Sequence, residues 1–454
     1  MIRFALSEAA VAMNGVLVGG DAEFSSVSTD TRSLSKGDLF VALKGERFDA
    51  HDHLNQACDK AVGAVVSRDG ANCASIKVKD TRLALGALAA AWRDKCSAKV
   101  VGLTGSNGKT TVKEMIAAIL AQVAPTLATK GNLNNDVGMP LTLMRLQDES
   151  YAVIEMGANH HGEIDYLSRI CRPDVALLNN AGRAHLEGFG DLQGVAKAKS
   201  EILHGLKDGG IFVYNADDRF ANQWIEKASG VKRVGFGLSE KAHVRSKDNS
   251  YTIEWLEEGC VASFDVEVET ESFPVSLKLL GKHNRMNALG AIAVALSLEV
   301  PIEKIQAGLA SLNSVPGRLH SLKAVSQSRL IDDSYNANPE SVIAAITLLS
   351  SAPGRRILVL GDLVELGDDR DQLHAELGQA AAQADIDVLF TCGQHIVNAH
   401  DSFTGEKHHY QQQADLIAAI QSFVRKDDVV LVKGSRSSHM EHVVSALQQE
   451  ASSC

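Results

Sequence analysis

The sequence predicts an α/β protein built from three domains. Apolar runs typical of buried strands alternate with helical patterns through most of the chain, as in mostly parallel sheets with crossover helices. A glycine-rich turn between one apolar run and the next helix predicts a phosphate-binding loop in the middle of the chain. A turn-rich break at residues 314–318 separates a second α/β series from the first. A length of 454 residues is consistent with two or three domains.

The first predicted domain, residues 1–82, is a small α/β unit. Strands are predicted at residues 38–44 and 64–67, with a helix at 53–61. An alanine-rich helical pattern at residues 81–95 leads into the next domain.

The central domain is predicted to cover residues 83–313 and to contain a mostly parallel sheet. Its elements follow the alternation of apolar runs and helical periodicity, and one alternating stretch predicts an added antiparallel hairpin. The strands are predicted at 100–104, 152–156, 175–178 and 211–214, the hairpin at 251–268, and the helices at 112–122, 162–171, 194–206, 284–298 and 302–312.

The third domain, residues 314–454, is predicted to be Rossmann-like. Strands are predicted at 330–331, 357–360, 388–390 and 429–432, and helices near 340–350, 371–383, 413–424 and 438–449. Ligands of open parallel sheets bind beyond the carboxyl ends of the strands. Polar residues occur there in this chain, at 332–333, 361–362 and 433–436.

Composition excludes several classes of protein. A net charge of −11 argues against a nucleic-acid-binding surface. Independently of the charge, we expect a monomer with small-molecule partners. The most apolar charge-free run, residues 286–298, is too short to span a bilayer, and no signal peptide is expected. Seven scattered cysteines without a CxxC pair predict free thiols in a reducing cytoplasm and no zinc site.

The predicted phosphate loop follows the strand at residues 100–104. Backbone N–H groups of such a loop point at an anion, and the following helix N-terminus adds partial positive charge. The loop differs from the strict nucleotide pattern because Leu103 stands where the first glycine belongs. Lys109 is expected to reach the outer phosphates, and the Thr110 hydroxyl to ligate magnesium. The loop residues are Gly105, Ser106, Asn107, Gly108, Lys109, Thr110 and Thr111.

Candidate metal-facing residues follow neighbouring strands. Glu155 ends a buried strand and could reach the same magnesium as Thr110, or it could be a structural carboxylate. His160 and His161 follow Glu155 in the chain. His185 follows the next strand and could bring an imidazole to the same rim, or it could be an ordinary surface histidine. Lys199 lies on the following helix, where a solvated lysine is the ordinary interpretation.

Amide and charged residues elsewhere could meet ligands. A loop with Asn132, Asn134 and Asn135 could hold a polar substrate or be an ordinary turn. Asn284 and Asn287 share a helix face and could contact a nucleoside or cap the helix. Arg318 could move onto phosphate from another domain or remain solvated.

Together these motifs resemble the Mur ligase family of peptidoglycan synthesis over essentially the whole chain. The motifs that carry the resemblance are the variant loop 104–111, the segment 332–339 and the segment 432–436. The segment 43–51 is similar to the family's UDP-binding domain. The resemblance implies a UDP-substrate domain at 1–82, an ATP-binding ligase domain at 83–313, and a C-terminal domain that contacts ATP and the incoming dipeptide.

The resemblance also implies roles for single residues. Loop residues 105–111 would hold the ATP phosphates, Asn284 and Asn287 the adenine side, and Arg318 and Asp333 the phosphates and ribose. Two Mg²⁺ ions would be served by Thr110, Glu155 and His185, and by Lys199 once it is carbamylated, with Lys197 as an alternative. The UDP-substrate set is Ser28, Asp30, Arg32, Lys44, Asp49, His51, Asn134 and Asn135. The dipeptide set is Lys433, Ser435 and Arg436.

The implied activity is ATP-dependent amide formation between a UDP-N-acetylmuramoyl-tripeptide and D-alanyl-D-alanine through an acyl phosphate. Lys109, Glu155, His185 and Lys199 would be the catalytic residues. Two alternatives remain open on the sequence: a sister ligase that adds another amino acid, as in folate polyglutamation, and a nucleotide-driven switch that is not a ligase.

Overall fold

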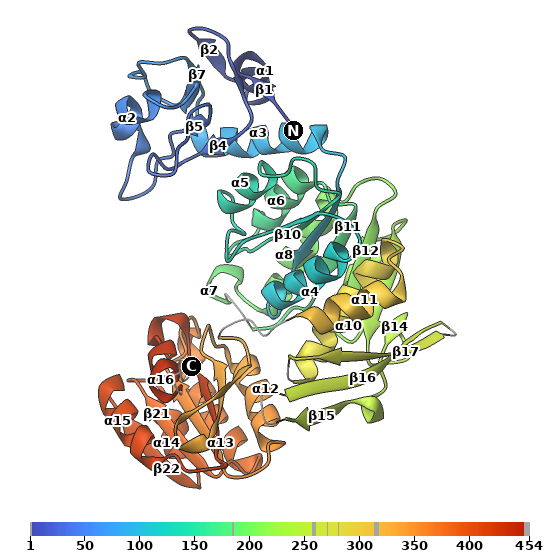
Figure 1. The fold of residues 1–454 in the computed structure, drawn as a ribbon, viewed down its shortest axis with the longest axis vertical. Helices are drawn as coiled ribbons and strands as arrows, with labels where there is room; N and C mark the ends of the chain where they lie inside the picture. Colours follow the sequence, from blue (N-terminus) through green and yellow to red (C-terminus); the bar gives the residue numbers. More distant parts are fainter. Residues whose placement is uncertain are drawn as a thin grey trace, which may run out of the picture.

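The computed structural model describes residues 2–183, 186–256, 260–269, 271–279, 281–312 and 317–448. Three lobes follow one another along the longest axis of the molecule (Figure 1). Each lobe contains its own main sheet, and the three sheets have five, ten and six strands. The prediction of an α/β fold with three sheet-containing units is confirmed.

The N-terminal lobe packs two helices on a five-stranded sheet of order β2-β7-β6-β5-β4. A separate two-stranded sheet, β1-β3, lies beside it. The strands are β1 Phe4–Ala5, β2 Val16–Val18, β3 Glu23–Phe24, β4 Val27–Ser28, β5 Leu39–Val41, β6 Gly63–Val66 and β7 Ser75–Lys77. The helices are α1 Leu6–Ala12, α2 Leu54–Cys58 and the short 3-10 helix η1 Ala50–His53.

Helix α3, Thr81–Lys95, connects this lobe to the central lobe. Asp80 caps it by accepting hydrogen bonds from the backbone N–H groups of Arg82 and Leu83. Trp92 stacks on Phe4 with ring centroids 5.4 Å apart, and its indole N–H donates to the Leu146 carbonyl at 2.9 Å. One buried side chain therefore joins the two lobes.

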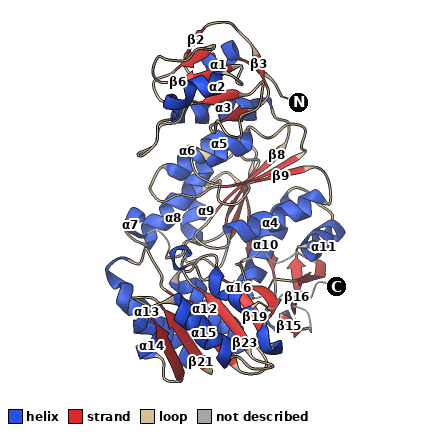
Figure 2. Cartoon of the chain, turned by 60° about the vertical axis from the view of Figure 1, so that its left-hand side comes forward, coloured by secondary structure: helices blue, strands red, loops and turns tan. Residues whose placement is uncertain are grey.

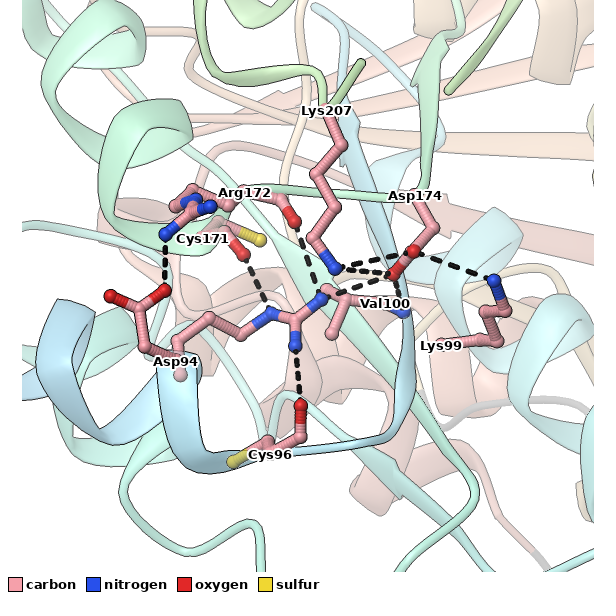
Figure 3. Close-up of polar contacts among 9 residues, drawn as sticks. Asp94, Cys96, Lys99, Val100, Cys171, Arg172, Asp174 and Lys207 are labelled. Carbon is pink, nitrogen blue, oxygen red and sulfur yellow. Dashed lines mark hydrogen bonds and ion pairs between the residues drawn. The ribbon is translucent and has the colours of Figure 1, made fainter. Parts of the chain in front are cut away.

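A second anchor lies at the end of α3, where the guanidinium of Arg93 is buried. Its nitrogens donate to the carbonyls of Cys96 and Cys171 at 3.2 and 3.1 Å, and to Asp174 at 3.0 Å. Figure 3 shows Asp174 between Lys99, Lys207 and the backbone of Val100. Because Asp174 also accepts from the Val100 N–H at 2.9 Å, the helix is tied to the start of the central strands.

The central sheet has the order β15-β16-β14-β13-β12-β11-β8-β10-β9, with β17 paired to β16. The strands from β9 to β14 run parallel, while the pairs made by β15, β16 and β17 are antiparallel, so the predicted hairpin is confirmed. The strands are β8 Lys99–Thr104, β9 Thr126–Ala128, β10 Tyr151–Glu155, β11 Val175–Leu178, β12 Ile211–Asn215, β13 Lys232–Gly237, β14 Val244–Arg245, β15 Thr252–Trp255, β16 Cys260–Val268 and β17 Glu271–Leu277.

Helices cover both faces of this sheet, which makes a three-layer lobe. One face packs against α4 Lys109–Ala121, α10 Lys282–Ser297 and α11 Ile302–Ser311. The other packs mainly against α6 Glu163–Cys171, α8 Leu192–Ser200 and α9 Ala221–Lys227. Two shorter helices, α5 Gly138–Leu143 and α7 Leu186–Phe189, complete the lobe.

The C-terminal lobe is a six-stranded sheet of order β18-β19-β23-β20-β21-β22, in which only β18 is antiparallel to its neighbour. Helices lie on both faces of the strands (Figure 2). The strands are β18 His320–Lys323, β19 Arg329–Asp333, β20 Arg356–Gly361, β21 Val388–Cys392, β22 Glu406–Tyr410 and β23 Val429–Lys433. The helices are α12 Pro339–Ser350, α13 Arg370–Gln383, α14 Val397–Ser402, α15 Gln413–Phe423 and α16 Glu441–Leu447.

The prediction that all cysteines are free thiols is wrong for one pair. Cys58 and Cys73 form a disulfide with Cα atoms 5.3 Å apart, because the end of α2 packs beside the loop that leads to β7. Spacing along the chain does not reveal such a neighbour. Cys96, Cys171 and Cys392 are free, as predicted. Cysteine usage therefore does not by itself indicate a reducing compartment, because one pair is bridged.

Within the described residues, none of the helices combines the length and the apolar character that crossing a bilayer requires.

Candidate functional site

A cavity of about 1070 Å³ lies between the central and C-terminal lobes. It opens at the carboxyl ends of the central strands, where ligands of parallel sheets bind. Most residues predicted for nucleotide, metal and dipeptide line it: Ser106, Asn107, Gly108, Lys109, Thr110, Thr111, Glu155, Asn284, Asn287, Arg318, Asp333, Lys433 and Arg436. The asparagines of the predicted polar-substrate loop, Asn132, Asn134 and Asn135, line it as well.

The phosphate loop lies at the centre of the sheet, because β8 pairs with both β10 and β11. The chain turns at Gly108, whose φ of +75° favours glycine, and α4 begins at Lys109. The Lys109 ammonium donates to the carbonyls of Gly105 at 2.8 Å and Ser106 at 3.2 Å. Burial lowers the pKa of Lys109. The loop therefore holds a partly desolvated cation beside a helix N-terminus, which suits a polyphosphate.

Asparagines that the sequence analysis missed hold this loop in shape. Asn180 accepts the Asn107 backbone N–H on its side-chain oxygen at 2.8 Å. The Asn179 amide donates to the Asn107 carbonyl and to the side-chain oxygen of Asn287, both at 3.0 Å. Asn179 and Asn180 directly follow β11. Polar residues at the carboxyl ends of parallel strands are candidates for a ligand site, as was inferred for Glu155, so the same reasoning could have identified them.

Gly108 has no room for a side chain. A Cβ atom built on it would lie 2.4 Å from the Asn287 side-chain oxygen. The predicted adenine-side residue Asn287 thus packs against the loop, and it also donates to Asn284 at 3.1 Å. Asn284 and Asn287 line the cavity and support the loop at once.

Gly108→Ala is expected to weaken binding of ADP, the nucleotide that such a loop should hold, by roughly tenfold or more, because the methyl group displaces Asn287. Isothermal titration measures the effect. Gly230→Ala is the matched control, since Gly230 has a similar φ of +81° but no heavy atom within 4 Å of the position that a Cβ atom would take. Equal losses in both variants would show that a strained glycine substitution weakens binding through a general effect on the fold, and not through the collision with Asn287.

Glu155 is a buried carboxylate in which one oxygen accepts a hydrogen bond and the other does not. Its Oε1 accepts from the Asn134 amide at 2.8 Å. Its Oε2 is buried without a hydrogen-bond partner among the described residues. An anionic oxygen in this state needs a cation or a donor from a ligand. Together with the Thr110 hydroxyl in the same cavity, it fits a hard divalent cation such as Mg²⁺.

Lys199 is not a solvated helix lysine, which was its ordinary interpretation. Its side chain is buried, with Nζ 3.5 Å from the carbonyl of Ala158, a residue that lines the cavity. Burial, and secondarily the nearby Lys109 cation, lower the pKa of Lys199 to about 7. Lys199 therefore presents an amine behind the cavity wall that is about half neutral near pH 7.

The histidine predictions have different outcomes. His160 is exposed and lies 3.2 Å from Glu163, and His161 packs edge-on against Phe189. His185 lies outside the described residues, so its predicted metal role stays a prediction.

The C-terminal lobe contributes directly to the loop. The Arg318 guanidinium lies 3.4 Å from the Thr110 hydroxyl and stacks on Tyr335. Asn338, the cap of α12, donates to the Asn107 side-chain oxygen at 2.6 Å. Glu340 accepts from Asn107 at 3.3 Å. Arg318 therefore reaches the phosphate loop from the C-terminal lobe, and its contact with phosphate stays a prediction.

The predicted dipeptide residues do not all face the cavity. Lys433 lines it and forms an ion pair with Asp333 at 2.7 Å; burial raises the pKa of Asp333. Arg436 also lines it. The Ser435 hydroxyl is buried and donates to the Asp362 carbonyl at 2.6 Å, which indicates a structural role. Nearby His283 was not predicted; burial, with Lys433 as a smaller cause, lowers its pKa to about 4.

The predicted UDP-site residues of the N-terminal lobe lie apart from this cavity. Arg32 pairs with Asp30 at 2.7 Å, and these bonds lower the pKa of Asp30 to about 2. His51 is buried between Asp49, at 2.6 Å, and the Ser67 backbone N–H, at 2.9 Å. None of the six described residues Ser28, Asp30, Arg32, Lys44, Asp49 and His51 is part of the cavity lining.

Comparisons with known proteins agree with this geometry. Residues 103–295 match the model of the Mur ligase middle domain, and residues 317–436 match that of the Mur ligase glutamate ligase domain. The UDP-N-acetylmuramoyl-tripeptide–D-alanyl-D-alanine ligase of Escherichia coli K12 is 46% identical over 455 residues, 99% of each chain.

Solved structures give the same result. A crystal structure of MurF from Acinetobacter baumannii has a TM-score of 0.90 at 39% identity and covers 98% of both chains. MurF ligase from Thermotoga maritima, crystallised in complex with ADP, has a TM-score of 0.84 at 29% identity and covers 93% of this chain and 96% of its own.

Proposed function

Because this chain belongs to the Mur ligase family, we propose that it joins D-alanyl-D-alanine to UDP-N-acetylmuramoyl-tripeptide at the expense of ATP. The products are UDP-N-acetylmuramoyl-pentapeptide, ADP and phosphate. The observation that carries the proposal is that the phosphate loop, the carboxylate of Glu155 and the cationic residues of the C-terminal lobe line one cavity.

The first step is attack of the tripeptide carboxylate on the γ-phosphorus of ATP, which forms an acyl phosphate and releases ADP. Both reactants are anionic, so their repulsion must be offset. Lys109, the loop N–H groups and the start of α4 supply positive charge from the central lobe, and Arg318 supplies it from the C-terminal lobe. Asn134 and Asn135 line the cavity where the UDP-linked substrate would meet ATP.

The second step is attack of the dipeptide amine on the acyl carbon, which releases phosphate. Lys433 and Arg436 lie on the C-terminal side of the cavity, where they can bind the dipeptide carboxylate. Acyl phosphates hydrolyse readily, so the lobes must exclude water while the amine binds. The contacts of Asn338 and Glu340 with Asn107 keep the C-terminal lobe on the loop.

We assign one magnesium site to Thr110 and Glu155 and a second to His185, with the carbamate of Lys199 as a further metal-facing group. Bound Mg²⁺ would neutralise phosphate charge during phosphoryl transfer. The orphaned Oε2 of Glu155 and the low pKa of Lys199 support this assignment. We also propose that the enzyme is a cytoplasmic monomer whose N-terminal lobe binds UDP.

The test is dependence of turnover on the amine. Protein, ATP, Mg²⁺ and UDP-tripeptide are incubated with D-alanyl-D-alanine, D-alanine, meso-diaminopimelate, L-lysine or glutamate, and products are identified by mass spectrometry. We expect phosphate release and a pentapeptide product only with the dipeptide. Product with glutamate or diaminopimelate would identify a sister ligase, and ATP hydrolysis that ignores every amine would indicate a nucleotide switch.

A further inference from the structure

Lys113 is a fully buried lysine that the proposed reaction does not use. It lies on α4 one helical turn beyond Lys109. Its ammonium donates to the backbone carbonyl of Thr129 at 2.5 Å and lies 2.8 Å from a carboxylate oxygen of Glu114. A lysine is seldom buried unless hydrogen bonds or an opposite charge compensate its ammonium, so the burial of Lys113 needs an explanation.

Thr129 is attached to the strand that ends in Glu155. Its backbone N–H donates to the Val153 carbonyl at 3.0 Å. Its hydroxyl accepts the backbone N–H of Glu155 at 3.0 Å, and its side chain is buried. Thr129 thus fixes the end of β10, and the Lys113 ammonium fixes Thr129.

The loop that begins after Thr129 returns to the same carboxylate. Asn134 in this loop donates to Oε1 of Glu155 at 2.8 Å, and its carbonyl accepts the Gly157 N–H at 2.9 Å. Backbone and side chain of Glu155 are therefore both held through the segment whose start Lys113 anchors. These contacts orient the carboxylate whose second oxygen, Oε2, is buried without a hydrogen-bond partner among the described residues.

We propose that Lys113 is a positioning residue for Glu155. Its buried ammonium couples the helix that follows the phosphate loop to the carboxylate that faces the nucleotide's magnesium. The inference rests on the proposed function through the role of Glu155. Groups behind metal ligands commonly change metal affinity by about 10–100-fold when they are removed.

The test uses the effect of Mg²⁺ on ADP affinity, measured by titration in excess Mg²⁺ and in EDTA. Lys113→Met keeps the length of the side chain and removes the charge. We expect this variant to need at least about tenfold more Mg²⁺ for half of the gain in ADP affinity, with metal-free ADP affinity unchanged. A general loss of structure would weaken ADP binding in both conditions.

Four further variants make the result decisive. Thr129→Val removes the hydroxyl that accepts from Glu155 but keeps the carbonyl that Lys113 contacts, so it tests the link between Thr129 and Glu155 and should reproduce the loss. Lys113→Leu, which also removes the charge, decides the question if Lys113→Met does not fold. Glu114→Gln removes only the surface partner of Lys113 and should respond like the wild type. Glu155→Gln is the reference for a lost magnesium response.

The outcomes separate the two proposals. If Glu155→Gln loses the magnesium response while Lys113→Met keeps it, the positioning role of Lys113 is overturned and the metal assignment stands, whatever Thr129→Val does. If Glu155→Gln itself responds like the wild type, the assignment of magnesium to Glu155 is wrong, and the role of Lys113 is rejected with it.

Discussion

Replacing Lys109 with alanine is expected to lower kcat by about 10³-fold, the loss typical when a charge-stabilising donor is removed from a desolvated site. Lys109 is held at the loop by the carbonyls of Gly105 and Ser106. Burial excludes water from around the ammonium, so its charge is poorly screened and acts strongly on a nearby phosphate. The same burial lowers the pKa of Lys109, and a bound polyphosphate would favour the charged form again. Steady-state release of phosphate in the presence of both substrates measures the effect.

The control for this variant is Lys232→Ala on β13, which removes an exposed lysine of the same lobe and should leave kcat unchanged. Thermal unfolding of both variants checks that the fold is retained. Full activity of a folded Lys109→Ala protein would remove this lysine from the phosphoryl-transfer step.

Replacing Lys199 with alanine is expected to reduce kcat by at least about 10²-fold, with partial recovery in formate, acetate or propionate. We expect this recovery if the group that acts in catalysis is a carbamate formed from the Lys199 amine and CO₂, because a small carboxylate can then occupy its place. Only a neutral amine attacks CO₂. With a pKa of about 7 instead of 10.5, roughly half of the amine is neutral at pH 7, against about one part in 3000 otherwise.

The sign of the pH dependence follows from this shift. Below about pH 7 the Lys199 ammonium predominates and cannot be carbamylated, so wild-type activity at limiting CO₂ should fall there and bicarbonate should raise it. Lys197→Ala is the matched control, because Lys197 is exposed on the same helix and should need no rescue. Normal activity of Lys199→Ala would reject the carbamate.

Long apolar runs carried most of the fold prediction. The predicted strands at 175–178 and 211–214 correspond to β11 and β12, because strands buried on both faces are apolar throughout. β22 was missed because its sequence, Glu406–Tyr410, is polar and it lies at the edge of its sheet. The edge position of β9, only three residues long, explains why it was missed too.

The site was predictable where its residues follow strands. Glu155 and the phosphate loop face one cavity because their strands are neighbours in a parallel sheet. Contacts between lobes were not predictable in detail: Arg318 reaches Thr110 across 208 residues of sequence. The burial of Lys113 and Lys199 was hidden for the same reason, since helical spacing does not tell what packs over a lysine.

The central claim is that the cavity couples ATP to the tripeptide carboxylate through an acyl phosphate. The direct measurement uses UDP-tripeptide labelled with ¹⁸O in its terminal carboxylate, with ATP, Mg²⁺ and D-alanyl-D-alanine, followed by mass spectrometry of the released phosphate. The account predicts one ¹⁸O atom in each phosphate formed together with pentapeptide. Pentapeptide accompanied by phosphate free of ¹⁸O would contradict it.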